Sequence, residues 1–112
     1  MKGQALKGHL DLLLLAVLSD GPKHGYAVIE ELKTRSGDAI DLPEGTVYPA
    51  LHRLEKSGYL RSEWTVTGGR RRRNYQLTNK GLKAAGEQRH AWDEFAQAMT
   101  GVLGSAQWAP TT

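Results

Sequence analysis

The spacing of apolar residues predicts that the first half of the chain is helical. From about Leu6 to Ser19, apolar positions cover most of the circumference of a helix, as in a helix that is buried or packed on two sides. Asp20, Gly21 and Pro22 end it, because glycine tolerates a left-handed cap and proline cannot continue the hydrogen-bond ladder. This helix is therefore expected in the core or at an interface.

Two further helices are expected before residue 60. One runs from about Gly25 to Arg35, and the other opens at Pro43, runs to Ser57 and stops at Gly58. The apolar positions that share one face are Tyr26, Ile29 and Leu32 in the first, and Val47, Ala50, Leu51 and Leu54 in the second. The opposite face of the second carries polar and basic side chains.

From Leu60 the apolar period changes to two, and it resumes up to Leu77, which predicts a β-hairpin. Its turn, residues 67–70, contains the glycines that a tight reversal needs. Thr78, with Asn79 as a second candidate, is expected to cap a last helix that reaches Leu103.

Composition limits the class of protein. A chain of 112 residues with 39% hydrophobic and 24% charged residues is typical of one soluble globular domain. The absence of cysteine excludes a disulfide framework and thiolate metal sites. The longest apolar run, Leu12 to Leu18, is too short to span a membrane, so we expect a cytoplasmic protein with no membrane partner.

Positive charge is concentrated in one segment. Residues 52–83 hold nine Lys and Arg side chains against two carboxylates, whereas the rest of the chain is slightly acidic. A local basic segment on a nearly neutral body is typical of a nucleic-acid footprint, in which neutralised phosphates supply most of the affinity. A solvated loop is the alternative.

Three helices, a hairpin and one long helix, in this order, match a mainly α winged helix-turn-helix with a long C-terminal dimerisation helix. Within this order, four motifs resemble the PadR family of bacterial regulators, and its short subgroup with a single C-terminal helix. These motifs are Gly21-Pro22-Lys23-His24-Gly25-Tyr26, then Gly45-Thr46-Val47-Tyr48-Pro49-Ala50-Leu51-His52-Arg53-Leu54-Glu55, then Gly58-Tyr59-Leu60, and the wing sequence Gly69-Arg70-Arg71-Arg72-Arg73-Asn74-Tyr75 with Leu77-Thr78. The resemblance implies a homodimer that binds double-stranded operator DNA, usually represses, and releases DNA when a small molecule or another signal arrives.

The resemblance places the third helix in the major groove of DNA. Small or polar residues at its leading end allow close approach to the duplex, and arginines on the hairpin suit phosphates or a narrow minor groove. The residues expected at DNA are Gly45, Thr46, Tyr48, Pro49, His52, Arg53, Lys56, Arg70, Arg71, Arg72, Arg73 and Tyr75. A solvated helix face and a solubility patch are the alternatives for these two segments.

The last helix is long for so small a domain, and its apolar stripe is expected to pair with a second copy. The residues expected at this dimer interface are Leu12, Leu15, Leu82, Ala85, Trp92, Phe95, Met99 and Val102. Trp92 and Phe95 either pack between the two chains or line a pocket for a small aromatic effector, and the sequence leaves both interpretations open.

The chain divides into a DNA-binding domain (residues 1–78), a dimerisation helix (79–104) and a flexible tail (105–112) that holds Trp108. Trp64 is expected beneath the wing, and His24 in the turn before the second helix. No catalytic group, cofactor motif or metal-ligand spacing is found, and the histidines are scattered over separate elements. We therefore expect no enzyme, no cofactor and no metal. A protein-assembly module and an RNA-binding adaptor remain alternative functions.

Overall fold

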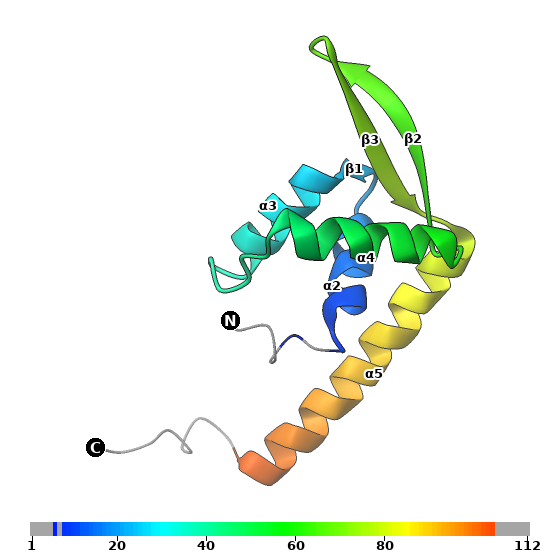
Figure 1. Cartoon of the computed structure of the whole chain (residues 1–112). Coiled ribbons are helices and arrows are strands. Elements are labelled where there is room, and N and C mark those ends of the chain that lie inside the picture. Colours follow the sequence, from blue (N-terminus) through cyan, green and yellow to red (C-terminus); the bar gives the residue numbers. More distant parts are fainter. Residues whose placement is uncertain (1–5, 7, 105–112) are drawn as a thin grey trace.

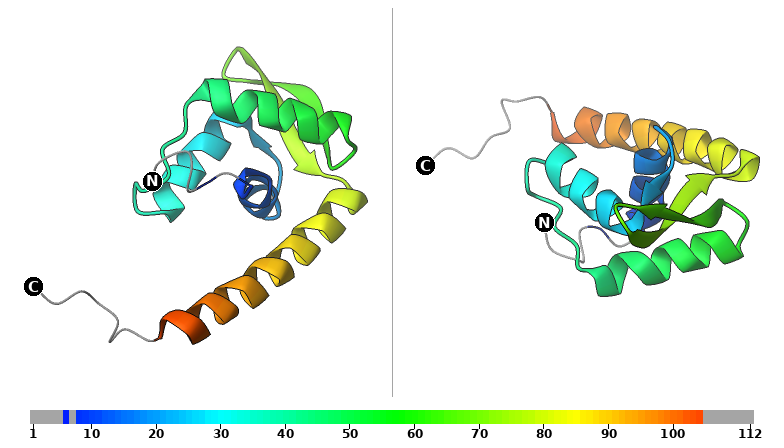
Figure 2. Two further views of the ribbon diagram at one scale, coloured as in Figure 1. Left: turned by 60° about the horizontal axis from the view of Figure 1, so that its bottom comes forward. Right: turned by 90° about the horizontal axis from the view of Figure 1, so that it is seen from above.

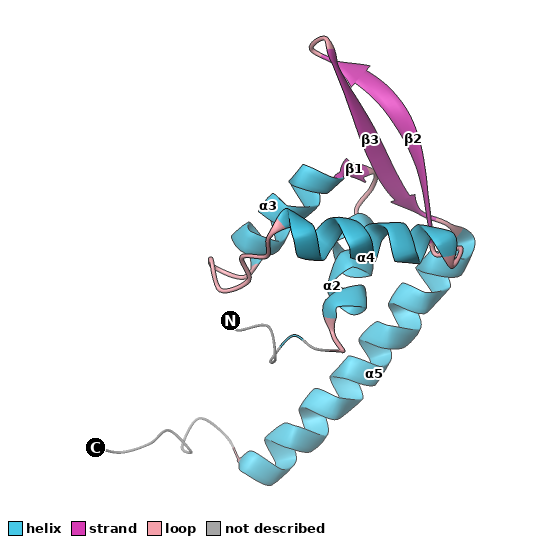
Figure 3. Ribbon diagram, in the orientation of Figure 1, coloured by secondary structure: helices cyan, strands magenta, loops and turns pink. Residues whose placement is uncertain are grey.

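Helices form the body of the protein, and a hairpin and a long helix extend from it (Figure 1). The computed structural model describes Leu6 and residues 8–104; Figure 3 distinguishes the helices from the strands. The elements are α2 (Leu10–Leu18), β1 (Lys23–His24), α3 (Gly25–Arg35), α4 (Glu44–Lys56), β2 (Leu60–Thr67), β3 (Arg70–Leu77) and α5 (Asn79–Leu103). The mainly helical winged helix-turn-helix fold expected from the sequence is confirmed.

The first helix begins later than its apolar pattern predicts. α2 starts at Leu10 rather than near Leu6, because Gly8 has a φ of 86°, which lies outside the helical region. The backbone N–H of His9 instead donates to the Leu6 carbonyl oxygen in a turn, at 2.9 Å. Beyond this turn α2 is central to the core, as expected, with Leu14 fully buried.

α3 and α4 pack against α2 and end where the stop signals of the sequence predict. α4 ends at Lys56, and Gly58 beyond it has a φ of 87°, the left-handed conformation that glycine adopts without strain. The four residues of the predicted inward stripe of α4 are all buried: Val47, Ala50, Leu51 and Leu54.

The sheet contains a strand that the sequence did not reveal. Its strand order is β1-β3-β2, and the two-residue β1 pairs antiparallel with β3, placing His24 opposite Asn74. Two residues are too few to show an alternating pattern, so pairing with β3 alone defines this strand. The predicted hairpin is confirmed, and Gly68 and Gly69 have φ values of 59° and 77°, as a tight turn of the I′ type requires.

α5 starts at the predicted cap and leaves the body of the protein. The Thr78 hydroxyl accepts a hydrogen bond from the Gly81 backbone N–H at 3.1 Å, and the helix runs for 25 residues to Leu103. Its first turns lie against the core, whereas its distal half extends past the other helices (Figure 1 and the left view of Figure 2). The expected tail with Trp108 lies outside the described residues. In the part of the chain that the structure describes, no helix combines the length and apolar character needed to cross a membrane.

Substitution by alanine is expected to have opposite effects at two glycines of α5, because only Gly81 lies against the loop before β2. A Cβ atom at Gly81 would collide with the Tyr59 carbonyl oxygen, whereas one at Gly86 meets nothing within 4 Å. Gly81→Ala should lower the free energy of unfolding by about 1–3 kcal/mol through this clash. Gly86→Ala should raise it by roughly 0.5–1 kcal/mol, because alanine is the better helix former. Urea unfolding followed by circular dichroism measures both; equal effects would contradict the close contact at Gly81.

Candidate nucleic-acid interface

α4 presents one face to solvent along its whole length. Thr46, Pro49, His52 and Lys56 are exposed on it, opposite the buried stripe that anchors the helix. Gly45, in the first turn, has open space where a side chain would begin. Because the leading end carries so little bulk, another large molecule can approach the α4 backbone closely.

Tyr48 differs from the other residues of this face because it is half-buried. Its ring lies against Gly25 at the start of α3, where an added Cβ atom would lie 2.5 Å from the ring. Burial, and then the carboxylate of Glu44, raise the pKa of the Tyr48 hydroxyl. Tyr48 therefore joins α3 to α4 and keeps a protonated hydroxyl at the edge of the face.

Arg53 makes an ion pair that the sequence does not suggest. Its guanidinium donates to both carboxylate oxygens of Asp11 in α2, at 2.6 and 3.1 Å, and this pairing raises its pKa. The Arg53 side chain is still 56% exposed. A phosphate can therefore reach the guanidinium, where it either replaces the Asp11 carboxylate or binds beside it.

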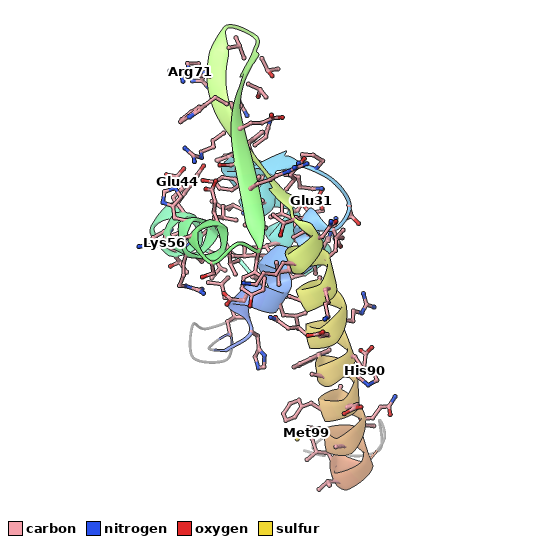
Figure 4. The ribbon with its side chains drawn as sticks, turned by 90° about the vertical axis from the view of Figure 1, so that its right-hand side faces the viewer. Glu31, Glu44, Lys56, Arg71, His90 and Met99 are labelled. Carbon is pink, nitrogen blue, oxygen red and sulfur yellow. The ribbon has the colours of Figure 1, made fainter. Side chains whose placement is uncertain are left out.

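The four wing arginines have four different environments. Arg73 donates to the Ser62 hydroxyl at 2.7 Å and pairs with Glu55 of α4 at 3.4 Å. Arg72 lies 2.7 Å from a ring nitrogen of His24, and Arg71 stacks over the Trp64 ring at 4.7 Å. Arg70 makes no side-chain hydrogen bond or ion pair with any described residue. Figure 4 shows Arg71 projecting from the wing on the side where α4 lies, so the wing and the exposed α4 face are turned to the same side of the protein.

Two sequence predictions about aromatic residues of the wing are wrong. Tyr75 cannot contact DNA, because it is 1% exposed and packs in the core at the base of the hairpin. Trp64 does not lie buried beneath the wing; it is 55% exposed, flanked by the guanidinium groups of Arg71 and Arg73. Both errors have one cause: the alternating pattern gives the face of a strand, but not how far the core extends along it.

His24 belongs to this surface, although the sequence indicated only a role in a turn. That role is confirmed, because its Nδ1 atom accepts a hydrogen bond from the Ala27 backbone N–H at 3.2 Å and caps α3. The ring also lines a hollow of about 710 Å³ between the helices and the wing. The other residues of this hollow are Gly25, Tyr26, Tyr48, Trp64 and the four arginines Arg70, Arg71, Arg72 and Arg73.

The residues expected at the dimer interface fall into two groups. Leu15 is fully buried in the core, so it is not available to a second chain, and Ala85 is partly covered by the same core. Among the expected residues, five on α5 are between 42% and 88% exposed: Leu82, Trp92, Phe95, Met99 and Val102. The partly exposed Leu12 lines a second hollow, of about 330 Å³, together with His9, Trp92 and Phe95.

The four histidines lie on separate parts of the described structure: His9 before α2, His24 in β1, His52 in α4 and His90 in α5. His90 pairs with Glu94 at 2.8 Å, and the His9 ring meets Trp92 edge-on at 5.2 Å. No group of three metal-ligating side chains gathers among the described residues.

Comparison with known proteins agrees with this geometry. Residues 14–87 match the model of the transcriptional regulator PadR-like family. The chain is 41% identical over 90 residues to a transcriptional regulator of Mycobacterium tuberculosis, covering 80% of this chain and 81% of that protein. A PadR family regulator from Eggerthella lenta superposes with a TM-score of 0.77 at 30% identity, over 91% of this chain and 88% of that one. A regulator from Clostridium thermocellum shares the fold with a TM-score of 0.82 at 24% identity, over 93% and 99% of the two chains.

The Asp11–Arg53 pair generates a prediction about affinity for nucleic acid. Asp11→Asn removes the carboxylate that pairs with Arg53, so the guanidinium becomes free to bind a phosphate of the duplex. Affinity for any DNA duplex should rise, and the slope of log K against log salt should steepen by about one unit. Fluorescence anisotropy with a labelled duplex over a salt series measures both quantities.

Asp20→Asn is the matched control, because it makes the same charge change but removes only one of the two carboxylates that pair with Arg35, and Glu31 still holds that arginine. The control should leave the slope unchanged. Equal responses of the two variants would show that Asp11 acts through net charge alone.

Proposed function

This chain belongs to the PadR-like family of transcriptional regulators, and we propose that it is a ligand-responsive repressor that binds operator DNA as a homodimer. Family membership makes it a DNA-binding transcription regulator and not an enzyme. The observation that supports operator binding is the common orientation of α4 and the wing. An exposed helix face and a cationic hairpin lie on the same side of the protein, over a hollow lined by four arginines.

The two parts of this surface have different tasks. α4 offers hydroxyl, imidazole and ammonium groups from Thr46, His52 and Lys56, which are side chains that can read base edges or bind phosphate. The wing offers guanidinium groups, which bind phosphates in bidentate fashion and enter narrow minor grooves. We assign sequence discrimination to α4 and most of the electrostatic affinity to the wing.

The exposed stripe of α5 supports the homodimer. Phe95 and Met99 are 52% and 43% exposed on the part of the helix that extends past the body of the protein. A second copy related by two-fold symmetry buries the same stripe on both chains. It also presents two copies of α4 to half-sites about 34 Å apart, one turn of DNA.

The hollow beside Trp92 supports the response to a ligand. Its walls come from α5, from the start of α2 and from the residues just before α2, so its shape depends on how α5 is placed against α2. Trp92 and Phe95 lie 5.8 Å apart between ring centroids, and the two rings offer flat faces to an aromatic effector. A helix is stiff over this length. An effector that changes the angle of α5 therefore also changes the distance between the two copies of α4, the recognition helices of the dimer.

Removing Arg70 and Arg71, the two wing arginines whose guanidinium groups make no hydrogen bond or ion pair with any described residue, tests the DNA-binding surface. The double variant Arg70→Ala, Arg71→Ala should bind all duplexes more weakly, and the salt slope should fall by up to about two units, close to one for each phosphate that is no longer neutralised. The control double variant Lys33→Ala, Lys83→Ala removes the same charge from exposed positions outside this surface. Anisotropy titrations that give one slope for both variants would refute the role of the wing. Tighter binding of double-stranded RNA than of DNA would favour the RNA-binding alternative.

Sedimentation velocity tests the dimer. The wild-type chain should sediment as a dimer at micromolar concentration, and Phe95→Glu with Met99→Glu should yield monomers, because two carboxylates cannot be buried in an apolar interface. Gln97→Glu places one carboxylate at an exposed position of the same helix and should leave the dimer intact. A monomeric wild-type chain would contradict the proposal.

A further inference from the structure

His24 receives more hydrogen-bond donors than a neutral ring can accept. Its Nδ1 atom accepts from the Ala27 backbone N–H at 3.2 Å, and its Nε2 atom lies 2.7 Å from Nη1 of Arg72. A neutral imidazole has one accepting nitrogen, whereas a guanidinium only donates. Because the cap of α3 uses Nδ1 as the acceptor, the proton belongs on Nε2. With this tautomer both groups are N–H donors, and they meet at one point where Nε2 of His24 and Nη1 of Arg72 are 2.7 Å apart.

The surroundings of this point suit an anion. It lies beside the hollow of about 710 Å³, to which Tyr26 of α3 and Tyr48 of α4 contribute their side chains. The charged side chains among the lining residues are the four wing arginines, and none of the described residues that line it is acidic. Glu55 pairs with Arg73 outside the lining, and Glu44 is the carboxylate that acts on Tyr48.

The ring is held in its neutral form. Burial, and then the positive charge of Arg72, lower the pKa of His24 below its ordinary value. Protonation would also place a second N–H on Nδ1, where it would meet the Ala27 N–H and break the cap. The helix cap and the wing thus select the same state of the ring, with Nε2–H as a donor.

Building on the DNA binding proposed above, we propose that His24 and Arg72 together bind one phosphate of the DNA backbone at the base of the wing. A phosphate oxygen placed between them accepts from both Nε2–H and the guanidinium, so it relieves the conflict between the two donors. Arg72 supplies the charge, and His24 supplies a neutral donor of fixed direction. The contact is independent of base sequence, and it ties the start of α3 to the wing in the complex.

A double-mutant cycle on a 30-base-pair duplex of arbitrary sequence tests this subsite. His24→Asn keeps a good N-cap residue but is too short to reach the phosphate, and Arg72→Gln removes the charge. Each should weaken binding about tenfold at pH 7.5, the order of one hydrogen bond to a charged group. The double variant should bind more tightly than the product of the two losses predicts, because both residues serve one phosphate. The salt slope should fall by about one unit for Arg72→Gln and stay unchanged for His24→Asn.

Three outcomes test the subsite separately from the proposed function. Wild-type affinity in His24→Asn, or losses that multiply in the double variant, would overturn the subsite while leaving DNA binding intact. Failure of the wild-type protein to bind any duplex would instead refute the proposed function. His90→Asn, an exposed histidine on α5 with a side chain 76% exposed, is the control and should bind as wild type.

Nuclear magnetic resonance of the imidazole nitrogens provides a readout that needs no variant. The wild-type protein should show His24 with its proton on Nε2, and the Nε2–H signal should shift when the duplex is added. A proton on Nδ1 in the complex, or a signal that does not respond to DNA, would overturn the assignment.

Discussion

The wing holds its position because the base of its hairpin is part of the hydrophobic core. Leu60 and Tyr75 are 2% and 1% exposed, and they pack with the buried faces of α2 and α4. Burying one such side chain contributes about 1.5–3 kcal/mol, so moving the hairpin base out of the core is costly. β1 pairs with the other edge of β3, and α5 begins directly after β3. One core therefore positions the recognition helix, the wing and the long helix relative to one another.

Ion pairs on the surface contribute much less to stability than this core does. Asp11–Arg53 and Glu55–Arg73 are ion pairs between partly exposed side chains, and such pairs contribute between about 0 and 1 kcal/mol. They orient the arginines in the free protein, but they are weak enough for a phosphate to replace the carboxylate. The contacts between charged groups are thus suited to exchange, while the apolar contacts beneath them stay fixed.

Apart from the two-residue β1, the elements of this protein and their order follow from the sequence alone. The stripe of α4, the glycine turn of the hairpin and the Thr78 cap depend on residues a few positions apart, so each is readable from a short segment. The Gly8 turn, the two-residue β1 and the burial of Tyr75 and Leu15 were missed or misjudged, because they depend on backbone conformation or on how far the core extends.

The roles of individual charged residues, in contrast, emerge from the tertiary structure. Arg70 to Arg73 are four identical side chains in a row, and no local signal separates them. Some partners of the arginines come from distant parts of the chain: His24 is 48 residues from Arg72, and Asp11 is likewise 42 residues from Arg53 of α4. Packing of the core brings such residues together, and an ion pair or a shared phosphate site follows from that proximity rather than from any pattern along the chain.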